Sequence, residues 1–102
     1  MVMHLDVGAD SYRALCDSFT WEVPDRYNIG VDVCGRWAHD RGRFALYFED
    51  DAGNTSAWTF WDIQRAANRL SNVLGALGTL FGDRVAIILP QRPQTGIAHV
   101  AI

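Results

Sequence analysis

Three histidines and two cysteines are the residues of this sequence best suited to bind a metal or act as nucleophiles. His4, His39 and His99 are isolated, with no cysteine or carboxylate at the spacing of a metal site, so we expect them on the surface or at helix ends. Cys16 and Cys34 lie 18 positions apart without a CxxC pair. This spacing favours buried free thiols in a reducing cytosol over zinc-ribbon or thioredoxin chemistry. Lysine is absent, which excludes Schiff-base chemistry and a lysine phosphate clamp.

Two loops carry residues that could hold ions. Asp50, Asp51 and Asn54 offer oxygen atoms of the kind calcium prefers, but they lack the ligand spacing and the closing glutamate of a calcium loop. We interpret them as a hairpin turn. Gly82 and Asp83 could begin a phosphate loop, yet such a loop precedes a helix whose amides face the anion, and a strand is expected here. We therefore expect a structural turn, with Asp83 hydrogen bonded to the backbone of that turn.

Aromatic and polar residues at two further places could contact ligands. Trp58 and Trp61, with Phe60 between them, could stack on nucleic-acid bases, but without a basic groove we favour packing beneath a hairpin. Gln91 and Arg92 follow an expected parallel strand, at the edge where open α/β sheets bind ligands. We favour a solvent-exposed or loop-anchoring role for this pair, and a ligand-lining role stays open.

The apolar pattern in the first half of the chain predicts two helices and a hairpin. Residues 11–19 have apolar side chains at helical spacing, with Ser11 as the N-terminal cap. Residues 29–40 predict a second helix, with Gly42 as its C-terminal cap. Strands at 44–49 and 55–59 flank a cluster of turn-forming residues, which is typical of a β-hairpin.

The second half predicts a long amphipathic helix followed by a buried strand. Apolar residues repeat every three or four positions over 60–77, Thr59 and Asp62 can form a capping box, and Gly78 suits a left-handed cap. Residues 84–89 (RVAIIL) do not alternate, which indicates a parallel strand covered by helices on both faces. Pro93 then suits the first turn of another helix.

The bulk composition is that of a globular protein of one domain or less. The chain has 102 residues, of which 49% are hydrophobic and 21% charged. We expect a chain of this size to bury about 60 to 70 per cent of its unfolded surface. A net charge of -3 argues against a general nucleic-acid surface. The sequence has neither a signal-peptide pattern nor an apolar stretch long enough to span a membrane, so we expect a cytoplasmic protein.

Four motifs resemble the AMP-forming, adenylating acyl-CoA synthetases. Residues 59–63 (TFWDI) resemble the TFxEL that opens a helix in that family, and residues 68–78 (NRLSNVLGALG) resemble its NRLANVLxxLG. Residues 82–91 (GDRVAIILPQ) resemble its GDRVAIxLPQ. Upstream, residues 27–30 (YNIG) and 33–38 (VCGRWA) resemble the FNIAxxVCDRWA entry of acetyl and medium-chain members. The matches follow the order of the family and cover residues 27–102.

The resemblance implies an α/β fold, namely the N-terminal portion of the synthetase large domain, with the strand at 84–89 in its parallel sheet. It implies an acid–thiol ligase that activates a carboxylic acid with ATP and magnesium, forms an acyl-adenylate and passes the acyl group to coenzyme A. The sequence lacks the Gly- and Ser/Thr-rich phosphate loop of the family, its acidic ATP–magnesium motif and its C-terminal lysine. Thr95 and Gly96 also replace a bulkier pair. We therefore assign no catalytic, cofactor-binding or metal-binding residue, and the acyl specificity stays open.

Two hypotheses of different classes follow. In the first, residues 1–26 are an extension with a short helix, and residues 27–102 are an incomplete N-terminal subdomain that is inactive alone and has the remainder of the synthetase as its partner. In that setting His99 could face the cleft of the full-length enzyme, and Gln91 and Arg92 could line its nucleotide or acyl site. In the second, the chain is a small interaction module that forms a homodimer through an unpaired sheet edge.

Overall fold

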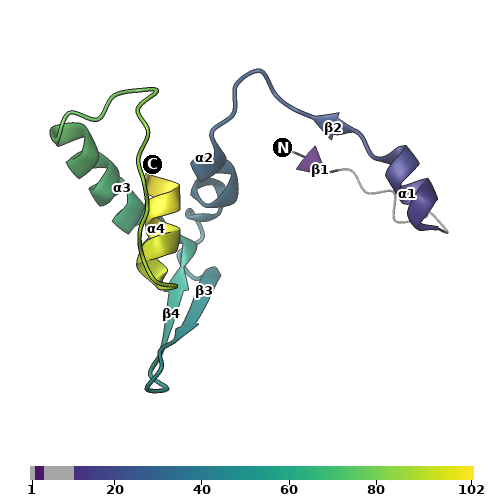
Figure 1. Cartoon of the computed structure of the whole chain (residues 1–102). Helices are drawn as coiled ribbons and strands as arrows, with labels where there is room; N and C mark the ends of the chain where they lie inside the picture. Colours follow the sequence, from purple (N-terminus) through teal and green to yellow (C-terminus); the bar gives the residue numbers. More distant parts are fainter. Residues whose placement is uncertain (1, 4–10) are drawn as a thin grey trace.

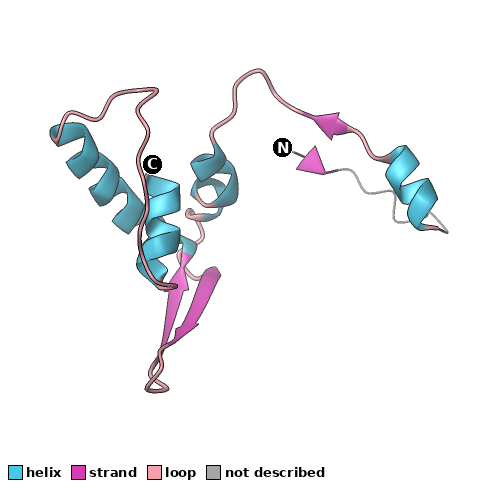
Figure 2. Ribbon diagram, in the orientation of Figure 1, coloured by secondary structure: helices cyan, strands magenta, loops and turns pink. Residues whose placement is uncertain are grey.

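The computed structural model describes residues 2–3 and 11–102, which form short helices and two small antiparallel sheets (Figures 1 and 2). The elements in chain order are β1 (Val2–Met3), α1 (Tyr12–Ser18), β2 (Trp21–Glu22), α2 (Ile29–Val33), the 3-10 helix η1 (Gly35–Trp37), β3 (Phe44–Glu49), β4 (Thr55–Thr59), α3 (Phe60–Ala76) and α4 (Pro93–Ala101). This mixture of helix and strand agrees with the expected α/β class.

The predicted hairpin is confirmed. β3 pairs antiparallel with β4 from Phe44 opposite Thr59 to Glu49 opposite Thr55, with an irregularity near the start of β3. The carboxylate of Asp50 closes the turn, because its Oδ1 accepts hydrogen bonds from the backbone N–H groups of Ala52 (3.0 Å) and Asn54 (2.8 Å). The acidic cluster is therefore a hairpin turn, as its residue types predict.

The long helix is also confirmed, together with both of its caps. The Oγ1 of Thr59 accepts a hydrogen bond from the Asp62 N–H at 3.1 Å, and the Asp62 carboxylate accepts one from the Thr59 N–H at 3.0 Å. This reciprocal pair satisfies two N–H groups at the N-terminus of α3. At the other end Gly78 has a φ of 95°, a left-handed conformation that glycine adopts without steric cost.

The helix predicted over 29–40 is only partly present. α2 begins as expected, with the side chain of Asn28 accepting the Val31 N–H, but it ends at Val33. Cys34 leaves the helical region (φ −132°, ψ −58°), and the chain continues as η1. The Gly35 that follows has low helix propensity, which explains the break. Gly42 is not a left-handed cap, because its φ is not positive; its N–H donates to Asp40 instead.

Segment 84–89 differs most from the sequence prediction, because it forms no strand. Among the described residues, β1 pairs with β2 and β3 pairs with β4, and no parallel pair occurs. A strand needs the hydrogen bonds of a neighbour, and none is offered to this segment. Val85 and Ile87 are half-buried, whereas Ile88 is 93% exposed. The prediction of a buried parallel strand is therefore wrong for this chain.

The core lies where α3, α4, the hairpin and the residue after α2 meet. Its buried side chains are those of Cys34, Ile63, Ala67 and Ile97, and half-buried residues of β3, β4 and α4 pack around them. Helix α4 begins with Pro93, as predicted, and packs against α3. A Cβ at Gly30 would lie 3.0 Å from the Val100 carbonyl oxygen, so the backbones of α2 and α4 approach closely.

The chain is less compact than a globular domain of its size. Its radius of gyration is 17.4 Å, against about 13 Å for a compact chain of this length. Its accessible surface is 8417 Å², against about 5,800 Å² for a compact monomer and about 16,500 Å² for the unfolded chain. The chain thus buries about half of its unfolded surface, rather than the expected share of about 60 to 70 per cent. In Figure 1, α1, β1 and β2 lie apart from the remaining elements.

Candidate functional site

A cleft of about 520 Å³ lies between α2, α3 and α4. Polar side chains of α3 and α4 form part of its wall, and the ends of α2 and α4 form the rest. The residues that line it are Tyr27, Asn28, Ile29, Gly30, Val31, Gln64, Ala67, Asn68, Ser71, His99, Val100, Ala101 and Ile102. Its volume lies in the range of small-molecule pockets.

Gln64 and Asn68 are the polar pair of the cleft. Gln64 Nε2 donates a hydrogen bond to Asn68 Oδ1 at 2.8 Å, which is the natural contact of residues four apart on one helix face. Gln64 Oε1 is buried and has no hydrogen-bond partner among the described residues. It lies beside Gly35, where a Cβ would be 3.4 Å away. A buried acceptor without a donor costs free energy, so this oxygen is a locally unfavourable feature of the cleft wall.

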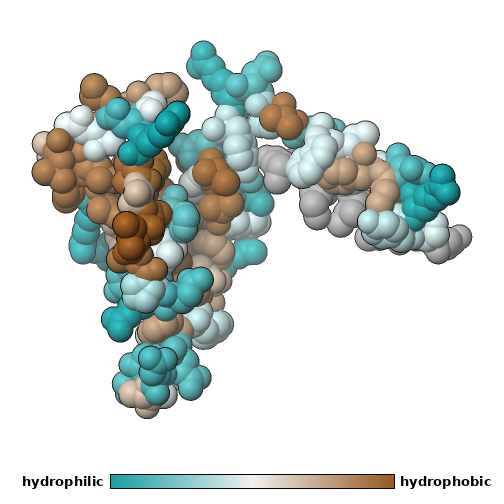
Figure 3. All heavy atoms as spheres, in the orientation of Figure 1, coloured by the Kyte–Doolittle hydropathy of each residue, from teal (hydrophilic) through white to brown (hydrophobic). Residues whose placement is uncertain are grey.

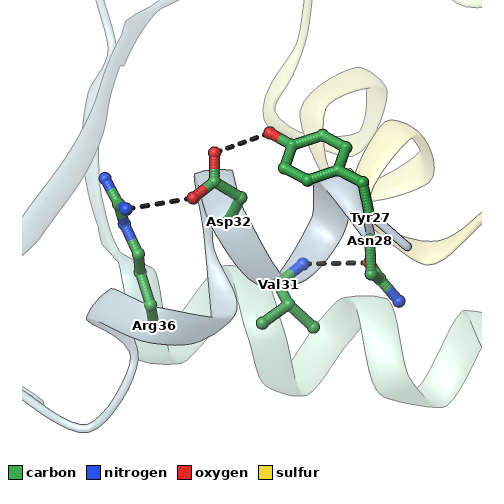
Figure 4. A network of polar contacts seen from close by, with 5 residues as sticks. All are labelled: Tyr27, Asn28, Val31, Asp32 and Arg36. Carbon is green, nitrogen blue, oxygen red and sulfur yellow. Dashed lines mark hydrogen bonds and ion pairs between the residues drawn. The ribbon is translucent and has the colours of Figure 1, made fainter. Parts of the chain in front are cut away.

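A short polar network fixes the start of α2 beside this cleft (Figure 4). Tyr27 donates its hydroxyl proton to Asp32 at 2.6 Å, and Arg36 forms a 3.0 Å ion pair with the other oxygen of that carboxylate. The hydrogen bond from Tyr27 lowers the pKa of Asp32, and the same bond raises the pKa of Tyr27. The network is exposed, and it links Tyr27, which precedes α2, to Asp32 in α2 and Arg36 in η1.

His99 is brought to the cleft, whereas Gln91 and Arg92 are not. His99 is exposed on α4 and lines the cleft together with Gln64. Gln91 and Arg92 are exposed in the bend before α4, where Arg92 precedes the first helical residue. The cleft can therefore form hydrogen bonds with a neutral polar ligand, but no nucleophile is paired with a base in it.

Of the four tryptophans, Trp58 belongs to the core region, and Trp37 and Trp61 contact arginines. Trp58 packs against the core as predicted. The guanidinium carbons of Arg41 and Arg65 lie 4.4 and 5.8 Å from the ring centroid of Trp61. The guanidinium groups of Arg36 and Arg43 lie 4.4 and 3.9 Å from the ring centroid of Trp37. Each cation–π contact stabilises an exposed site by about 0.5 to 1 kcal/mol.

Sequence reasoning missed the polar network and these stacks. A signal for part of them was available: Asp32 and Arg36, like Gln64 and Asn68, are four residues apart on helices. The contacts between Arg41 and Trp61 join separate elements, so no local spacing indicated them.

The cysteines differ from each other. Cys34 is buried as predicted, its thiol lies 3.6 Å from the Phe60 carbonyl oxygen, and burial raises its pKa. The prediction that Cys16 is buried is wrong, because α1 contains no buried residue and leaves this thiol exposed. His39 is exposed as expected, with Nδ1 2.7 Å from the Arg36 carbonyl oxygen, and His4 lies outside the described residues.

Within residues 2–3 and 11–102, no three or more His, Cys, Asp or Glu side chains gather where they could hold a metal ion. None of the helices in that part of the chain is both long enough and apolar enough to cross a bilayer.

The Gly82–Asp83 turn is structural, because the Asp83 carboxylate accepts a hydrogen bond from the Leu80 N–H at 2.7 Å.

Comparison with known proteins points to one group of enzymes. The chain is similar to the acetyl-coenzyme A synthetase of Gemmatimonas aurantiaca, with 37% identity over 83 residues that cover 79% of this chain and 13% of the relative. The acetyl-coenzyme A synthetase of Streptomyces coelicolor is 39% identical over the same shares. The mitochondrial acyl-coenzyme A synthetase ACSM3 of Rattus norvegicus is 28% identical over 89% of this chain and 17% of the relative.

No family model and no solved structure matches the chain. The chain spans 13–17% of the length of these relatives, so it corresponds to a small part of them. Over most of its length, the chain is homologous to the acetyl- and acyl-coenzyme A synthetases and corresponds to a part of such a synthetase.

Proposed function

We propose that the chain is the N-terminal part of the large domain of an AMP-forming acyl-CoA synthetase, and that its role there is structural. One observation carries this proposal: 72–89% of the chain aligns with synthetases of which it covers only 13–17%. The resemblance of residues 59–63, 68–78 and 82–91 to motifs of that family supports the same placement.

The remainder of the synthetase would carry the chemistry. The whole enzyme would activate a carboxylic acid with ATP and magnesium and transfer the acyl group to coenzyme A. The described residues do not fit a triphosphate or its metal, because the turn at Gly82 leads into an extended segment rather than a helix N-terminus. They also form no cluster of metal-ligating side chains. We therefore assign no catalytic step to the residues of this chain. As a separate part of the proposal, we place the whole enzyme in the cytoplasm.

The exposed apolar segment supports this reading. In an adenylation domain, residues 84–89 would lie between strands supplied by the rest of the enzyme, which would provide the missing hydrogen bonds. The large accessible surface fits the same picture, because the chain leaves about 2,600 Å² more surface exposed than a compact monomer of its mass would. Burial of this surface by the remainder of the synthetase would complete the fold.

A chimera tests the proposal. The matching 83-residue segment of the Gemmatimonas aurantiaca synthetase is replaced by the aligned residues of this chain. We expect the chimera to retain ATP- and CoA-dependent thioester formation from acetate, and we expect the same enzyme with the segment deleted to lose it. A chimera carrying Ala67→Arg, which buries a charge in the core, is the matched control and should also lose activity.

Two results would overturn the proposal. The first is thioester formation by the 102-residue chain alone. The second is a chimera that unfolds at the same temperature as the parent synthetase but forms no acyl-adenylate in an ATP–pyrophosphate exchange assay. In that case the chain folds within the synthetase without supporting its activity.

A further inference from the structure

Exposed arginines without a carboxylate partner lie around the first turns of α3. They are Arg41, Arg43, Arg65 and Arg69, and we call them the arginine surface. Within residues 2–3 and 11–102, their guanidinium groups form no ion pair and donate no hydrogen bond, whereas Arg36 does both with Asp32. Like charges that lie close together repel each other. An anion bound among these arginines would relieve that repulsion.

Contacts at the start of α3 bring these arginines together. The guanidinium carbons of Arg41 and Arg65 lie 4.4 and 5.8 Å from the ring centroid of Trp61. The carbonyl oxygen of Arg43 accepts a hydrogen bond from the Phe60 N–H at 3.0 Å. A guanidinium group over an indole ring is restrained, and it keeps N–H groups that can hydrogen bond to an oxyanion.

A hollow of about 510 Å³ lies beside the arginine surface, between β4 and α3. Arg65 and Arg69 line it together with Ala57, Trp58 and Ala66. The apolar side chains of the hollow suit an aliphatic or aromatic group, and its two arginines suit carboxylates beside that group.

Carboxylates of the chain itself interrupt the arginine surface. Asp40 is exposed directly before Arg41, and Asp62 lines the hollow together with Arg65. A continuous phosphate backbone would meet these negative charges as well as the arginines, and the whole chain has a net charge of -3. Separate carboxylates on a peptide can contact the arginines and avoid both aspartates. The mixed charge therefore favours an acidic peptide over a nucleic acid.

The arginine surface differs from the surface that the rest of a synthetase would bury. Figure 3 shows hydrophobic residues gathered over α4 and the chain before it, and apolar surface of this kind is suited to burial inside a larger domain. Burial of unpaired charges is strongly unfavourable. The arginine surface should therefore stay in water in the whole enzyme, where a second protein can reach it.

We propose that the arginine surface is a docking site for a short acidic segment of a second protein, with an apolar side chain of that segment in the hollow. Arginine and tryptophan are enriched in the centres of protein interfaces. Arg65 and Arg69 lie about 6 Å apart along α3. Residues two apart in an extended peptide lie on one face at about 6.5 to 7 Å, so carboxylates at that spacing match the two arginines.

Fluorescence anisotropy of a labelled peptide tests the docking on the 102-residue chain. In the probe, acetyl-ESESLSES-amide carrying fluorescein, glutamates and one leucine alternate with serine. We expect a Kd below about 100 μM at low ionic strength, and a Kd at least about fivefold higher in 0.5 M salt, which screens exposed charges. The same peptide with glutamine in place of glutamate should bind at least about tenfold more weakly. Equal binding of the two peptides, or no binding at about 1 mM, would overturn the proposal.

Matched arginine substitutions test the location of the docking site. Arg65→Gln removes one charge from the arginine surface and should raise the Kd by at least about fivefold. Arg13→Gln removes the same charge from α1, which lies apart from the remaining elements in Figure 1, and should leave the Kd within about twofold. Both side chains are exposed, and far-UV circular dichroism should show that both variants keep the fold. An equal effect of the two substitutions would refute the location.

The synthetase chimera distinguishes a second protein from the rest of the enzyme as the occupant. We expect the chimera to bind the peptide with a Kd within about threefold of that of the chain alone. An active chimera that does not bind the peptide would overturn this proposal and leave the proposed function intact. A folded chimera that binds the peptide but forms no acyl-adenylate would support the docking site and contradict the proposed function.

Discussion

The capping box at the start of α3 allows a quantitative prediction. Thr59→Ala removes the Oγ1 that accepts the Asp62 N–H at 3.1 Å and donates to the Asp62 carboxylate at 2.7 Å. Loss of such a cap costs about 1 kcal/mol of unfolding free energy, within a range of about 0.5 to 2. Asp62→Asn keeps an acceptor for the Thr59 N–H but removes a negative charge from the helix N-terminus, at a cost of about 0.3 to 1 kcal/mol.

The two substitutions should not be additive, because both disrupt the same contact. In a double-mutant cycle we expect a coupling of about 0.5 kcal/mol or more. Urea unfolding followed by far-UV circular dichroism measures each free energy. Thr20→Ala is the matched control, since Thr20 is exposed and lies outside any helix. Two results would show that the cap does not stabilise α3. In one, the losses of unfolding free energy in the two single variants add up to the loss in the double variant; in the other, the Thr59→Ala chain is as stable as the Thr20→Ala control.

The same contact predicts a pH dependence. Hydrogen bonds from Thr59 lower the pKa of Asp62 below its ordinary value of 3.8, so the unfolded chain binds this proton more readily than the folded one. The stabilisation is therefore complete above the unfolded pKa and is lost as pH falls through the lowered folded pKa. The cost of Thr59→Ala should shrink as the pH is reduced from 7 through this window. A cost that is constant down to about pH 2 would contradict the assignment.

Three further predictions concern the backbone, the core and the thiols. Gly78→Ala should lower the free energy of unfolding by about 1 kcal/mol, because φ is 95° at this position. Gly75→Ala inside α3 should raise the free energy of unfolding by about 0.5 to 1 kcal/mol, because a new Cβ meets nothing within 4 Å there. Urea unfolding should show these two changes with opposite signs, and changes of the same sign would contradict the prediction. Ile63→Ala should lower the free energy of unfolding by about 2 to 3 kcal/mol, and Ile63→Val should lower it by about 1 kcal/mol. Equal losses in the two variants would show that this side chain is not packed in the core. Cys16 should react with iodoacetamide in the native chain and Cys34 only in urea, as mass spectrometry can show; fast native labelling of Cys34 would contradict its burial.

The elements that the sequence predicts well are those determined by local interactions. The cap at Thr59, the apolar repeat of α3 and the turn at Asp50 each form from residues within a few positions of one another. The α1 helix is predicted for the same reason. The register of the hairpin and the cleft beside Gln64 depend on distant residues, and the cleft was not anticipated.

The strand at 84–89 was mispredicted for an instructive reason. An apolar run without alternation indicates that both faces of a segment need to be buried. It does not indicate whether neighbouring strands and helices are present to bury them. The backbone hydrogen bonds of a helix are made within one segment, so those of α3 need no partner segment, whereas a parallel strand depends on hydrogen bonds from neighbours elsewhere. The exposure of Ile88 therefore reflects a requirement that the described residues do not meet. The exposure of Cys16 has a similar cause, because no residue of α1 is buried by the other described elements.

Hydrogen exchange of the amides of residues 84–89 tests most directly whether this segment is a strand awaiting its neighbours. In a dilute solution of the chain, we expect these amides to exchange at close to unprotected rates, while those of α3 are protected. In the synthetase chimera, the same amides should be protected as strongly as those of α3. Protection already present in the dilute chain, or fast exchange in an active chimera, would contradict the account.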